Sequence, residues 1–374
     1  MPHAFTVLLT NSSDIYGGGE FFVLELAKAL LGRGHRIWVC CRPDNLLREK
    51  CEQAGVPIVP LAFPPNGRLV KHIRDLKRII LERGVNIVHT NGNYDRTAGA
   101  FAAWRAGVAH VTNVHSLQSI QHNLTHRVRN RMLTDRFLAD GVRVKELLVQ
   151  QDGIPPSGIV VFYHGVNPDS MRRDQQLRSS TRKQLGCPGD EVIIGNVARF
   201  VGMKGHSYLL NAFAEVAGEF SHARLVLVGD GELWEESKAL SRTLGVEKRV
   251  IFTGFREDLQ ALYSSFDIYA HASIEGAGET ISFAVQQALA QELPVIVTRV
   301  GDVAENVREG INGFVVPDRD GKALAARLRT LLGDRSLRET MGLESRKYLL
   351  ERFTTERMVS AVESVYRDVL KTRV

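Results

Sequence analysis

The chain has 374 residues, of which 44% are hydrophobic and 24% charged, a composition typical of folded globular proteins rather than disordered or fibrous ones. At about 100–200 residues per domain, this length predicts two domains that each bury a core. The formal net charge is +6, and all of the excess lies in residues 1–170, which hold 20 Lys and Arg against 14 Asp and Glu. A basic half is typical of a protein with a polyanionic partner (an anionic membrane, an acidic glycan or nucleic acid), and equally of solvated helix surfaces.

The termini and the cysteines exclude several classes. No apolar run reaches the roughly 20 residues that a membrane-spanning helix needs. The apolar start, Met1 to Thr10, ends at a polar stretch and does not read as a secretory signal. The four cysteines lack the Cys-x-x-Cys spacing of zinc sites and redox motifs. We therefore expect a cytoplasmic protein with no metal site and no disulfide framework.

Short β-branched segments alternate with longer amphipathic ones, which predicts an α/β fold with parallel sheets. The strands predicted in the first half are Thr6–Leu9, Arg36–Cys40, Asn86–His89, Val111–His115 and Arg136–Ala139. A helix is predicted over Glu20–Leu31, where Phe22 and Leu26 share one face.

The pattern restarts in the second half. Its predicted strands are Val192–Val197, Leu225–Val228, Val250–Phe252, Ile268–His271, Val295–Thr298 and Gly313–Val316. Gly, Pro, Asn and Asp cluster between Tyr163 and Asp169, as in an interdomain hinge. We therefore predict domains at 1–167 and 168–353, followed by a helical segment at 354–374. The apolar stripe of that last helix must pack on another element.

A glycine-rich loop follows the first predicted strand. Gly17, Gly18 and Gly19 precede Glu20 and open the first helix, where glycine lets the backbone approach a ligand and free N–H groups favour an anion. Phe22 stands where the dinucleotide fingerprint G-x-G-x-x-G needs its third glycine, which argues against a nicotinamide-dependent oxidoreductase. The loop fits a phosphate or acceptor site, and equally a structural turn.

Loops with cations or glycines follow strands of the second half. Arg199 and Lys204 follow Val192–Val197, and this pair suits a diphosphate because Arg can fork onto phosphate oxygens and Lys adds a point charge. Open α/β sheets bind ligands at the carboxyl ends of their strands, so these loops are expected to meet in one crevice. Surface cations without a ligand are the alternative. Other residues of these loops are Gly229, Gly254, Phe255 and Arg256.

The segment from Ala272 to Val297 combines a glycine-containing loop, Glu279, a helical run and a β-branched strand. Glu279 is expected near the helix N-terminus, where backbone N–H groups are available to phosphate and the carboxylate to sugar hydroxyls. The residues that follow Glu279 in this stretch are Thr280, Ile281 and Ser282. A glutamate that simply caps the helix is the alternative.

The order of these motifs resembles the family-4 retaining glycosyltransferases of the GT-B fold, known as glycosyltransferase group 1. The motifs are Gly-Gly-Gly-Glu, His-Gly-Val-Asn, Arg-x(4)-Lys-Gly, Val-Gly-Asp-Gly-Glu, Thr-Gly-Phe, and Glu279 ahead of Ala-Leu-Ala-Gln-Glu-Leu-Pro-Val. The resemblance covers nearly the whole chain and is strongest between Tyr163 and Val316. It implies two Rossmann-like domains whose parallel sheets face each other across a cleft, with the donor mainly on the second domain and the last helix packed on the first.

The resemblance also implies residue roles. Arg199 and Lys204 match the pair that neutralises the donor diphosphate, and Glu279 matches the first glutamate of Glu-x(7)-Glu, which contacts the donor sugar. His115 matches the family histidine near the transferred sugar, although a lone histidine at a strand end is often a satisfied rim group. Gly18, with Gly19 beside it, matches the loop glycine over the reaction centre. Residues 253–256 match the loop beside the nucleotide base.

Two positions depart from the family pattern. Gln287 stands where the second glutamate of Glu-x(7)-Glu binds the ribose hydroxyls, and it can hydrogen-bond them only without charge. Thr280 stands where the family often has glycine, so the loop is expected to be stiffer there.

The implied reaction transfers a sugar from a nucleoside diphosphate sugar, with UDP-sugars favoured, to a hydroxyl acceptor with retention of configuration and without a metal or other cofactor. The expected acceptor is a glycan or glycolipid, as in lipopolysaccharide or exopolysaccharide synthesis, and no nucleic acid is expected. Basic segments 68–78 and 126–131 fit an anionic membrane or lipid acceptor, and equally the polar faces of helices. The alternatives are a donor-binding protein with weak or lost catalysis, and an epimerase or glycan phosphorylase of the same fold.

Overall fold

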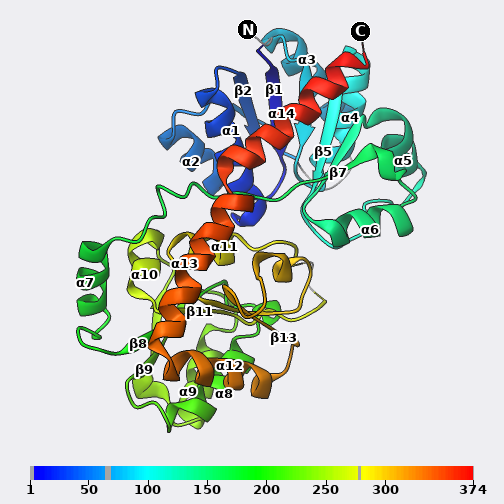
Figure 1. Cartoon of the computed structure of the whole chain (residues 1–374). Coiled ribbons are helices and arrows are strands. Elements are labelled where there is room, and N and C mark those ends of the chain that lie inside the picture. The colour runs from blue at the N-terminus through cyan, green and yellow to red at the C-terminus, as the bar shows by residue number, and fades with distance from the viewer. Residues whose placement is uncertain (1–3, 64–68, 277–278, 374) are drawn as a thin grey trace. The chain divides into compact units, whose positions relative to one another are not determined.

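The computed structural model describes residues 4–63, 69–276 and 279–373, so Arg68 of the first basic segment lies outside the described residues. The chain forms two compact units (Figure 1). Unit 1 comprises Met1–His164 and Thr355–Val374, and unit 2 comprises Gly165–Thr354. The first unit boundary, between His164 and Gly165, lies inside the segment from Tyr163 to Asp169. The second lies between Thr354 and Thr355.

Unit 1 contains, within its described residues, a seven-stranded parallel sheet in the order β3-β2-β1-β4-β5-β6-β7. The strand order reverses between β1 and β4, the switch point at which open α/β sheets bind ligands beyond the carboxyl ends of their strands. The strands are β1 (Thr6–Asn11), β2 (Arg36–Cys41), β3 (Ile58–Pro60), β4 (Ile87–Thr90), β5 (Ala109–Val114), β6 (Arg136–Ala139) and β7 (Ile159–Val161).

Helices cover this sheet, and their apolar faces supply its core. Ile73, Leu76 and Ile80 of α3 pack with Leu8 and Val88 of the central strands in one buried cluster. The helices are α1 (Gly18–Gly32), α2 (Leu46–Gln53), α3 (Leu69–Arg83), α4 (Asp95–Ala106), α5 (Leu124–Val128), the π-helical turn η1 (Arg129–Leu133), α6 (Val142–Gln150), the 3₁₀ turn η2 (Pro156–Gly158) and α14 (Thr355–Lys371).

The last helix, α14, belongs to unit 1 and lies against α1 (Figure 1). Its predicted stripe of Met358, Val362, Val365 and Val369 is buried. The Tyr366 hydroxyl lies 2.7 Å from His89 Nδ1 in the centre of the sheet. Burial lowers the pKa of His89 to about 3, so this histidine is neutral and makes a structural contact.

Unit 2 contains a six-stranded parallel sheet over the part that the structure describes, in the order β10-β9-β8-β11-β12-β13. The order reverses between β8 and β11, as it does between β1 and β4 in unit 1. The strands are β8 (Val192–Val197), β9 (Ala223–Val228), β10 (Val250–Gly254), β11 (Ile268–His271), β12 (Val295–Thr298) and β13 (Gly313–Val316).

The helices of unit 2 bury one large apolar cluster against this sheet. They are α7 (Gln175–Gln184), α8 (His206–Ala217), α9 (Trp234–Thr243), α10 (Leu259–Ser265), α11 (Phe283–Ala290), α12 (Gly321–Gly333) and α13 (Arg335–Arg352), with 3₁₀ turns η3 (Gly202–Lys204), η4 (Glu247–Arg249) and η5 (Val303–Asn306).

Several observed strand ends lie one or two residues from the predicted ones, and two differences concern the sheet edges and the site. The edge strands β3 and β7 were not predicted; each has three residues, too few for a periodic signal. The strand predicted over Val111–His115 runs instead over Ala109–Val114, so His115 is the first residue after the strand.

Candidate functional site

Loops that carry two cations and a carboxylate meet at the carboxyl edge of the unit 2 sheet. Arg199 lies two residues beyond β8, Lys204 ends the turn η3, and Glu279 lies beyond β11. Arg199 and Lys204 share the connection between β8 and α8. A backbone hydrogen bond of 2.9 Å from Ile274 N to Met203 O joins this connection to the loop after β11. The structure therefore brings Lys204 and Glu279 together, although they are 75 positions apart in the sequence.

Two glycines allow the close contact between these loops. Gly205 has φ +64°, and a Cβ atom there would lie 2.0 Å from Ala272 O. Gly229 has φ +132°, and a Cβ atom there would lie 2.1 Å from Ala198 O. Any side chain would have to displace backbone at both positions, which holds the loops after β8, β9 and β11 against one another. Gly229 N also donates to Gly254 O at 2.9 Å, which adds the loop after β10.

The Glu279 side chain is 9% exposed and has one cationic and one imidazole neighbour. Its Oε2 lies 2.5 Å from Lys204 Nζ, and its Oε1 lies 3.3 Å from His271 Nε2. Burial raises the pKa of Glu279, but the Lys204 charge and His271 outweigh burial and lower the pKa to about 2. Glu279 is therefore ionised at neutral pH, and it neutralises the cation predicted to bind diphosphate.

Arg199 differs from Lys204 in having no such neighbour. Its side chain is exposed and makes no hydrogen bond or ion pair with any residue in the described part of the chain. The edge of the unit 2 sheet thus presents an uncompensated guanidinium, the group that proteins favour for phosphate oxygens.

Ser282, and not Glu279, caps helix α11, because Ser282 Oγ accepts a hydrogen bond from Val285 N at 3.4 Å. The predicted capping alternative for Glu279 is therefore wrong. The neighbouring Thr280 and Ile281 are buried. Gln287 lies within α11 and is 8% exposed.

Of the four residues predicted to lie beside the nucleotide base, 253–256, the first two end β10 and the last two, Phe255 and Arg256, follow it. The Phe255 side chain is 60% exposed, so its ring is available to a planar ligand. Arg256 Nε instead donates to Asp258 Oδ1 at 2.7 Å, so this arginine is partly neutralised by a carboxylate two residues away.

The glycine-rich loop of unit 1 leads directly to His115. Helix α1 begins at Gly18, and Glu20 Oε2 accepts a hydrogen bond from Gly17 N at 2.9 Å. A Cβ atom at Gly19 would lie 3.6 Å from His115 Cδ2, an ordinary van der Waals contact. The loop and the predicted catalytic histidine are therefore neighbours at the carboxyl edge of this sheet.

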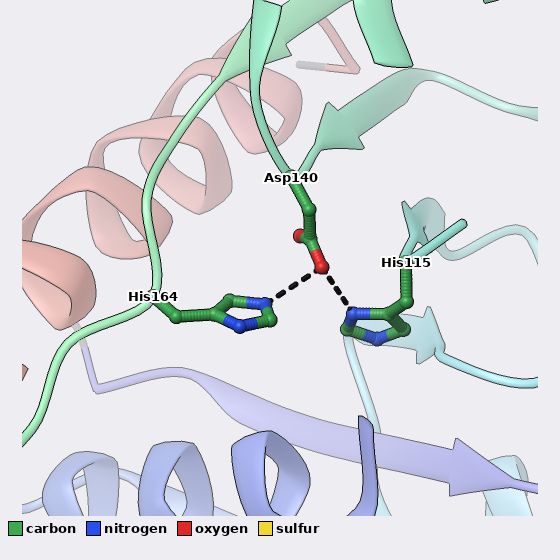
Figure 2. A group of neighbouring side chains, drawn as sticks. All are labelled: His115, Asp140 and His164. Carbon is green, nitrogen blue, oxygen red and sulfur yellow. Dashed lines mark hydrogen bonds and ion pairs between the residues drawn. The ribbon is translucent and has the colours of Figure 1, made fainter. Parts of the chain in front are cut away.

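His115 also contacts a carboxylate that sequence analysis did not single out. Val114 and Ala139 are register partners at the ends of β5 and β6, so the next residues, His115 and Asp140, are brought side by side. Asp140 Oδ2 lies 2.5 Å from His115 Nδ1 and 2.7 Å from His164 Nε2, as Figure 2 shows.

Asp140 is fully buried between these two imidazoles. Burial raises the pKa of its carboxyl group, but the charges and hydrogen bonds of His115 and His164 outweigh burial and hold the pKa well below its usual range. Two imidazoles and one carboxylate are also a set of ligands that transition metals accept. The sequence showed no such grouping because its members lie on three different loops.

Three residues of these clusters were missed from the sequence: Asp140, His164 and His271. A positional signal existed for two of them, since Asp140 directly follows a predicted strand and His271 ends one. The carboxyl ends of parallel strands share one edge, so each belonged with the site residues beside it. His164 lies three residues beyond β7, a strand that the sequence does not predict, and falls within the predicted hinge.

The family comparison agrees with this geometry. Residues 16–170 match the family described as Glycosyltransferase Family 4, and residues 178–348 match Glycosyl transferases group 1. The chain belongs to the family-4, group 1 glycosyltransferases.

Relatives of this glycosyltransferase support the same assignment. It is 30% identical to the N-acetyl-alpha-D-glucosaminyl L-malate synthase of Bacillus anthracis over 51% of its own length and 49% of that protein. It is 27% identical to the phosphatidyl-myo-inositol mannosyltransferase of Mycobacterium leprae over 96% of its own length and 95% of that protein. The match thus spans about half of some curated relatives, 53% for the lipopolysaccharide core glycosyltransferase LpsE of Rhizobium meliloti, and nearly all of others.

Solved structures show the same GT-B fold. HepE of Anabaena, in complex with UDP, has a TM-score of 0.87 at 22% identity and covers 97% of this glycosyltransferase and 100% of that chain. A glycosyltransferase of Rickettsia africae has a TM-score of 0.90 at 21% identity, with coverage of 98% and 99%. Across the residues that the structure describes, every helix is too short or too polar to cross a membrane.

Proposed function

We propose that this protein transfers a sugar from a nucleoside diphosphate sugar to a hydroxyl acceptor with retention of configuration. The observation that carries the proposal is the edge of the unit 2 sheet, where the unpaired Arg199 and the ion pair of Lys204 and Glu279 lie on loops fixed by glycines. A diphosphate needs cations and a sugar needs a fixed hydrogen-bond acceptor, and this edge offers both.

The chemistry that these residues supply is electrostatic. When the bond between the sugar and the diphosphate breaks, negative charge grows on the leaving phosphate. Arg199 binds that charge directly, and Lys204 moves part of its interaction from Glu279 to phosphate. Cations placed before the reaction stabilise such charge without reorganisation. In this proposal the acceptor attacks from the face that the diphosphate leaves, and the leaving phosphate takes the acceptor proton.

Glu279 and His115 serve the sugar in this proposal. The Glu279 carboxylate, ionised and anchored by Lys204 and His271, accepts hydrogen bonds from sugar hydroxyls. His115 serves the transferred sugar from unit 1. Both groups are held by neighbouring side chains, which is how a site keeps its geometry through a reaction.

We propose a UDP-sugar as the donor and a glycan or glycolipid as the acceptor. Support for the donor comes from HepE, whose structures hold UDP and UDP-glucose. Support for the acceptor comes from relatives named for lipopolysaccharide core and phosphatidyl-myo-inositol substrates. The basic excess of the first half supports contact with an anionic membrane or anionic lipid acceptor.

The test is a thermal-shift and turnover screen of UDP-, GDP- and ADP-sugars. A bound donor at 100 times its dissociation constant should stabilise the fold by about 2.7 kcal/mol. The donors that shift the melting temperature are then supplied with lipid-linked and soluble hydroxyl acceptors, and proton NMR of the product reads the anomeric configuration. Inversion would overturn the retaining mechanism. Binding without turnover would favour a donor-binding protein, the alternative that Gln287 suggests.

We also propose that turnover needs no divalent metal, because Arg199 and Lys204 supply the positive charge. An Asp-x-Asp sequence, Asp318-Arg319-Asp320, does follow β13, but its carboxylates have structural partners. Asp318 Oδ2 accepts from Glu275 N at 3.0 Å, and Asp320 Oδ1 accepts from Ala323 N at 2.9 Å to cap α12. Turnover in excess chelator should equal turnover in manganese; activity lost with chelator and restored by manganese would overturn the proposal.

A further inference from the structure

We infer that Asp140 is a positioning residue that fixes the tautomer and orientation of His115, with His164 holding Asp140 from its other side. The inference rests on the proposed function, in which His115 serves the transferred sugar. It adds to that function a carboxylate and a second histidine, both buried behind His115.

The contacts of Asp140 define which ring nitrogen of His115 carries the proton. An ionised carboxylate can only accept hydrogen bonds, so His115 Nδ1, at 2.5 Å, must donate. In the neutral ring Nε2 is then the acceptor. The Asn113 side-chain nitrogen lies 2.9 Å from His115 Nε2 and 3.1 Å from His115 Nδ1, so the contact with Asp140 alone assigns this tautomer.

His164 and Phe22 complete the support. His164 Nε2 lies 2.7 Å from the same Asp140 oxygen, so the carboxylate is held between two rings (Figure 2). The buried ring of Phe22 stacks on His164 with centroids 5.0 Å apart and meets His115 edge-on at 5.2 Å. Both imidazoles therefore contact the same carboxylate, Asp140, and the same aromatic ring, Phe22.

Asp140 differs from the buried carboxylates of unit 1 that brace the backbone. Asp152 Oδ2 accepts from Ile120 N at 3.0 Å, and Asp95 Oδ2 accepts from Asn91 N at 3.3 Å. Asp140 Oδ2, in contrast, contacts two imidazole rings, and Asp140 Oδ1, like Asp95 Oδ1, is buried without a hydrogen bond within the described residues. The contacts of Asp140 are thus directed at the histidines.

The distances favour this role over a metal site. Two ligands of one tetrahedral zinc, each about 2.0–2.1 Å from the ion, lie about 3.3–3.4 Å apart. Asp140 Oδ2 is 2.5 and 2.7 Å from the two imidazole nitrogens, which are hydrogen-bond separations. A metal at this place would have to push the three groups apart.

The first arm of the test reads the tautomer without any activity. Nitrogen-15 spectra of the histidine rings, assigned with a His115→Gln variant, should show His115 protonated at Nδ1 and unprotonated at Nε2 in the neutral form. Asp140→Asn should change the ring-nitrogen shifts of His115, because the amide can donate to Nδ1. Asp152→Asn is the matched control: a buried carboxylate of the same unit whose loss should leave these shifts unchanged. Unchanged shifts in Asp140→Asn would overturn the inference.

The second arm is a double-mutant cycle on turnover. Asp140→Asn should lower kcat/KM about 10- to 100-fold, the range for partners that orient a histidine from behind. In the His115→Gln background the same substitution should change kcat/KM by less than about twofold, because its effect passes through His115. Asp152→Asn should have the same effect in both backgrounds. Equal effects of Asp140→Asn in both backgrounds would show a merely structural role.

Two further outcomes distinguish this inference from a metal site and from a failure of the proposed function. Stoichiometric zinc in the purified protein that is lost in Asp140→Asn would overturn it in favour of a metal site. If the wild-type protein turns over no sugar nucleotide, the proposed function fails, and the nitrogen spectra alone decide whether Asp140 positions His115.

Discussion

A carboxylate lies at the carboxyl edge of each sheet, the buried Asp140 in unit 1 and the nearly buried Glu279 in unit 2, and the partners of the two differ. Asp140 lies between two histidines, whereas Glu279 lies between Lys204 and His271. In both places the neighbours outweigh burial and lower the pKa of the carboxyl group. The same strand order thus supports two kinds of site: one that orients imidazoles and one that holds a permanent cation.

The difference shows where function resides in this fold. Both sheets reverse their strand order after the first strand, so their framework is nearly the same. The residues that follow the strands make one edge cationic, with the exposed Arg199, and the other rich in histidine. We therefore expect substitutions at the unit 2 edge to act on the diphosphate, and substitutions at the unit 1 edge to act on the reacting sugar.

Removing the cations of unit 2 should lower kcat/KM more than the other substitutions proposed for the two sheet edges. Arg199→Ala should lower kcat/KM by at least about 10- to 100-fold, because a charge-assisted hydrogen bond contributes about 1.5–3 kcal/mol in the ground state and more as charge develops. The melting temperature should stay unchanged, because Arg199 is exposed. Arg242→Ala, an exposed cation on α9, is the control. Wild-type turnover in Arg199→Ala would remove Arg199 from the site.

Lys204→Ala should lose activity as well, and in addition it should lose stability. It leaves the ionised Glu279 without its cation, and breaking a fully buried pair from one side costs about 3–5 kcal/mol, an upper bound for this partly exposed pair. Adding Glu279→Gln should restore much of the melting temperature and none of the activity. A melting temperature of Lys204→Ala equal to that of the wild type would show that Lys204 does not stabilise the ionised Glu279.

Acid titration tests Glu279 itself. Its pKa in the folded protein is about 2, below the ordinary value of 4.5, so the folded state binds this proton less tightly. The resulting stability, roughly 3 kcal/mol, is fully present above pH 4.5 and is lost as the pH falls towards 2. Denaturant unfolding from pH 7 to pH 3 should therefore show a shallower loss of stability in Glu279→Gln than in the wild type. Parallel pH curves would contradict the pairing with Lys204.

Much of the fold could be predicted from the sequence, because the central strands are buried on both faces and therefore consist of continuous apolar segments. Four of the six strands of unit 2 were predicted to the residue, including β8 and β11. The edge strands β3 and β7 could not be predicted, since three residues show no period and packing defines them.

The candidate site was predictable in its parts but not in its contacts. Arg199, Lys204 and Glu279 could be named from their positions after strands. The 2.5 Å contact of Lys204 with Glu279 could not, because it depends on the packing of Gly205 against Ala272. Asp140 could have been placed beside His115 from strand ends alone, whereas the contribution of His164 needed β7.

The basic surface of unit 1 should give a smaller effect. Arg127 and Arg131 are exposed on α5 and η1, beside Leu124 and Met132, which are 74% and 75% exposed. Each arginine near an anionic membrane contributes about 1 kcal/mol, so replacing both with Ala should weaken vesicle binding about 30-fold at low salt. Sedimentation with anionic and neutral vesicles measures this. Arg242→Ala with Lys248→Ala, on unit 2, is the control; equal binding to both vesicle types would remove the membrane contact.

The smallest expected effect concerns Gln287, where the sequence leaves its family. If Gln287 contacts the ribose, its neutral amide contributes about 0.5–1.5 kcal/mol per hydrogen bond, against about 1.5–3 kcal/mol for a carboxylate. Gln287→Glu should then tighten donor binding about five- to tenfold and change turnover less, because the ribose is remote from the reacting carbon. Calorimetric titration of the donor into both proteins, at one pH and salt, measures this.

Burial sets a limit on that gain. Gln287 is 8% exposed, so a carboxylate there loses part of its hydration unless ribose hydroxyls replace the water. The gain should therefore appear only with the donor bound, and Gln287→Glu without donor should be less stable than the wild type. Gln184→Glu, on the surface of α7, controls for the added charge. Weaker donor binding in Gln287→Glu would mean that burial wins over the hydroxyl contacts, and affinities equal within twofold would mean that Gln287 does not face the donor and that the family register is shifted here.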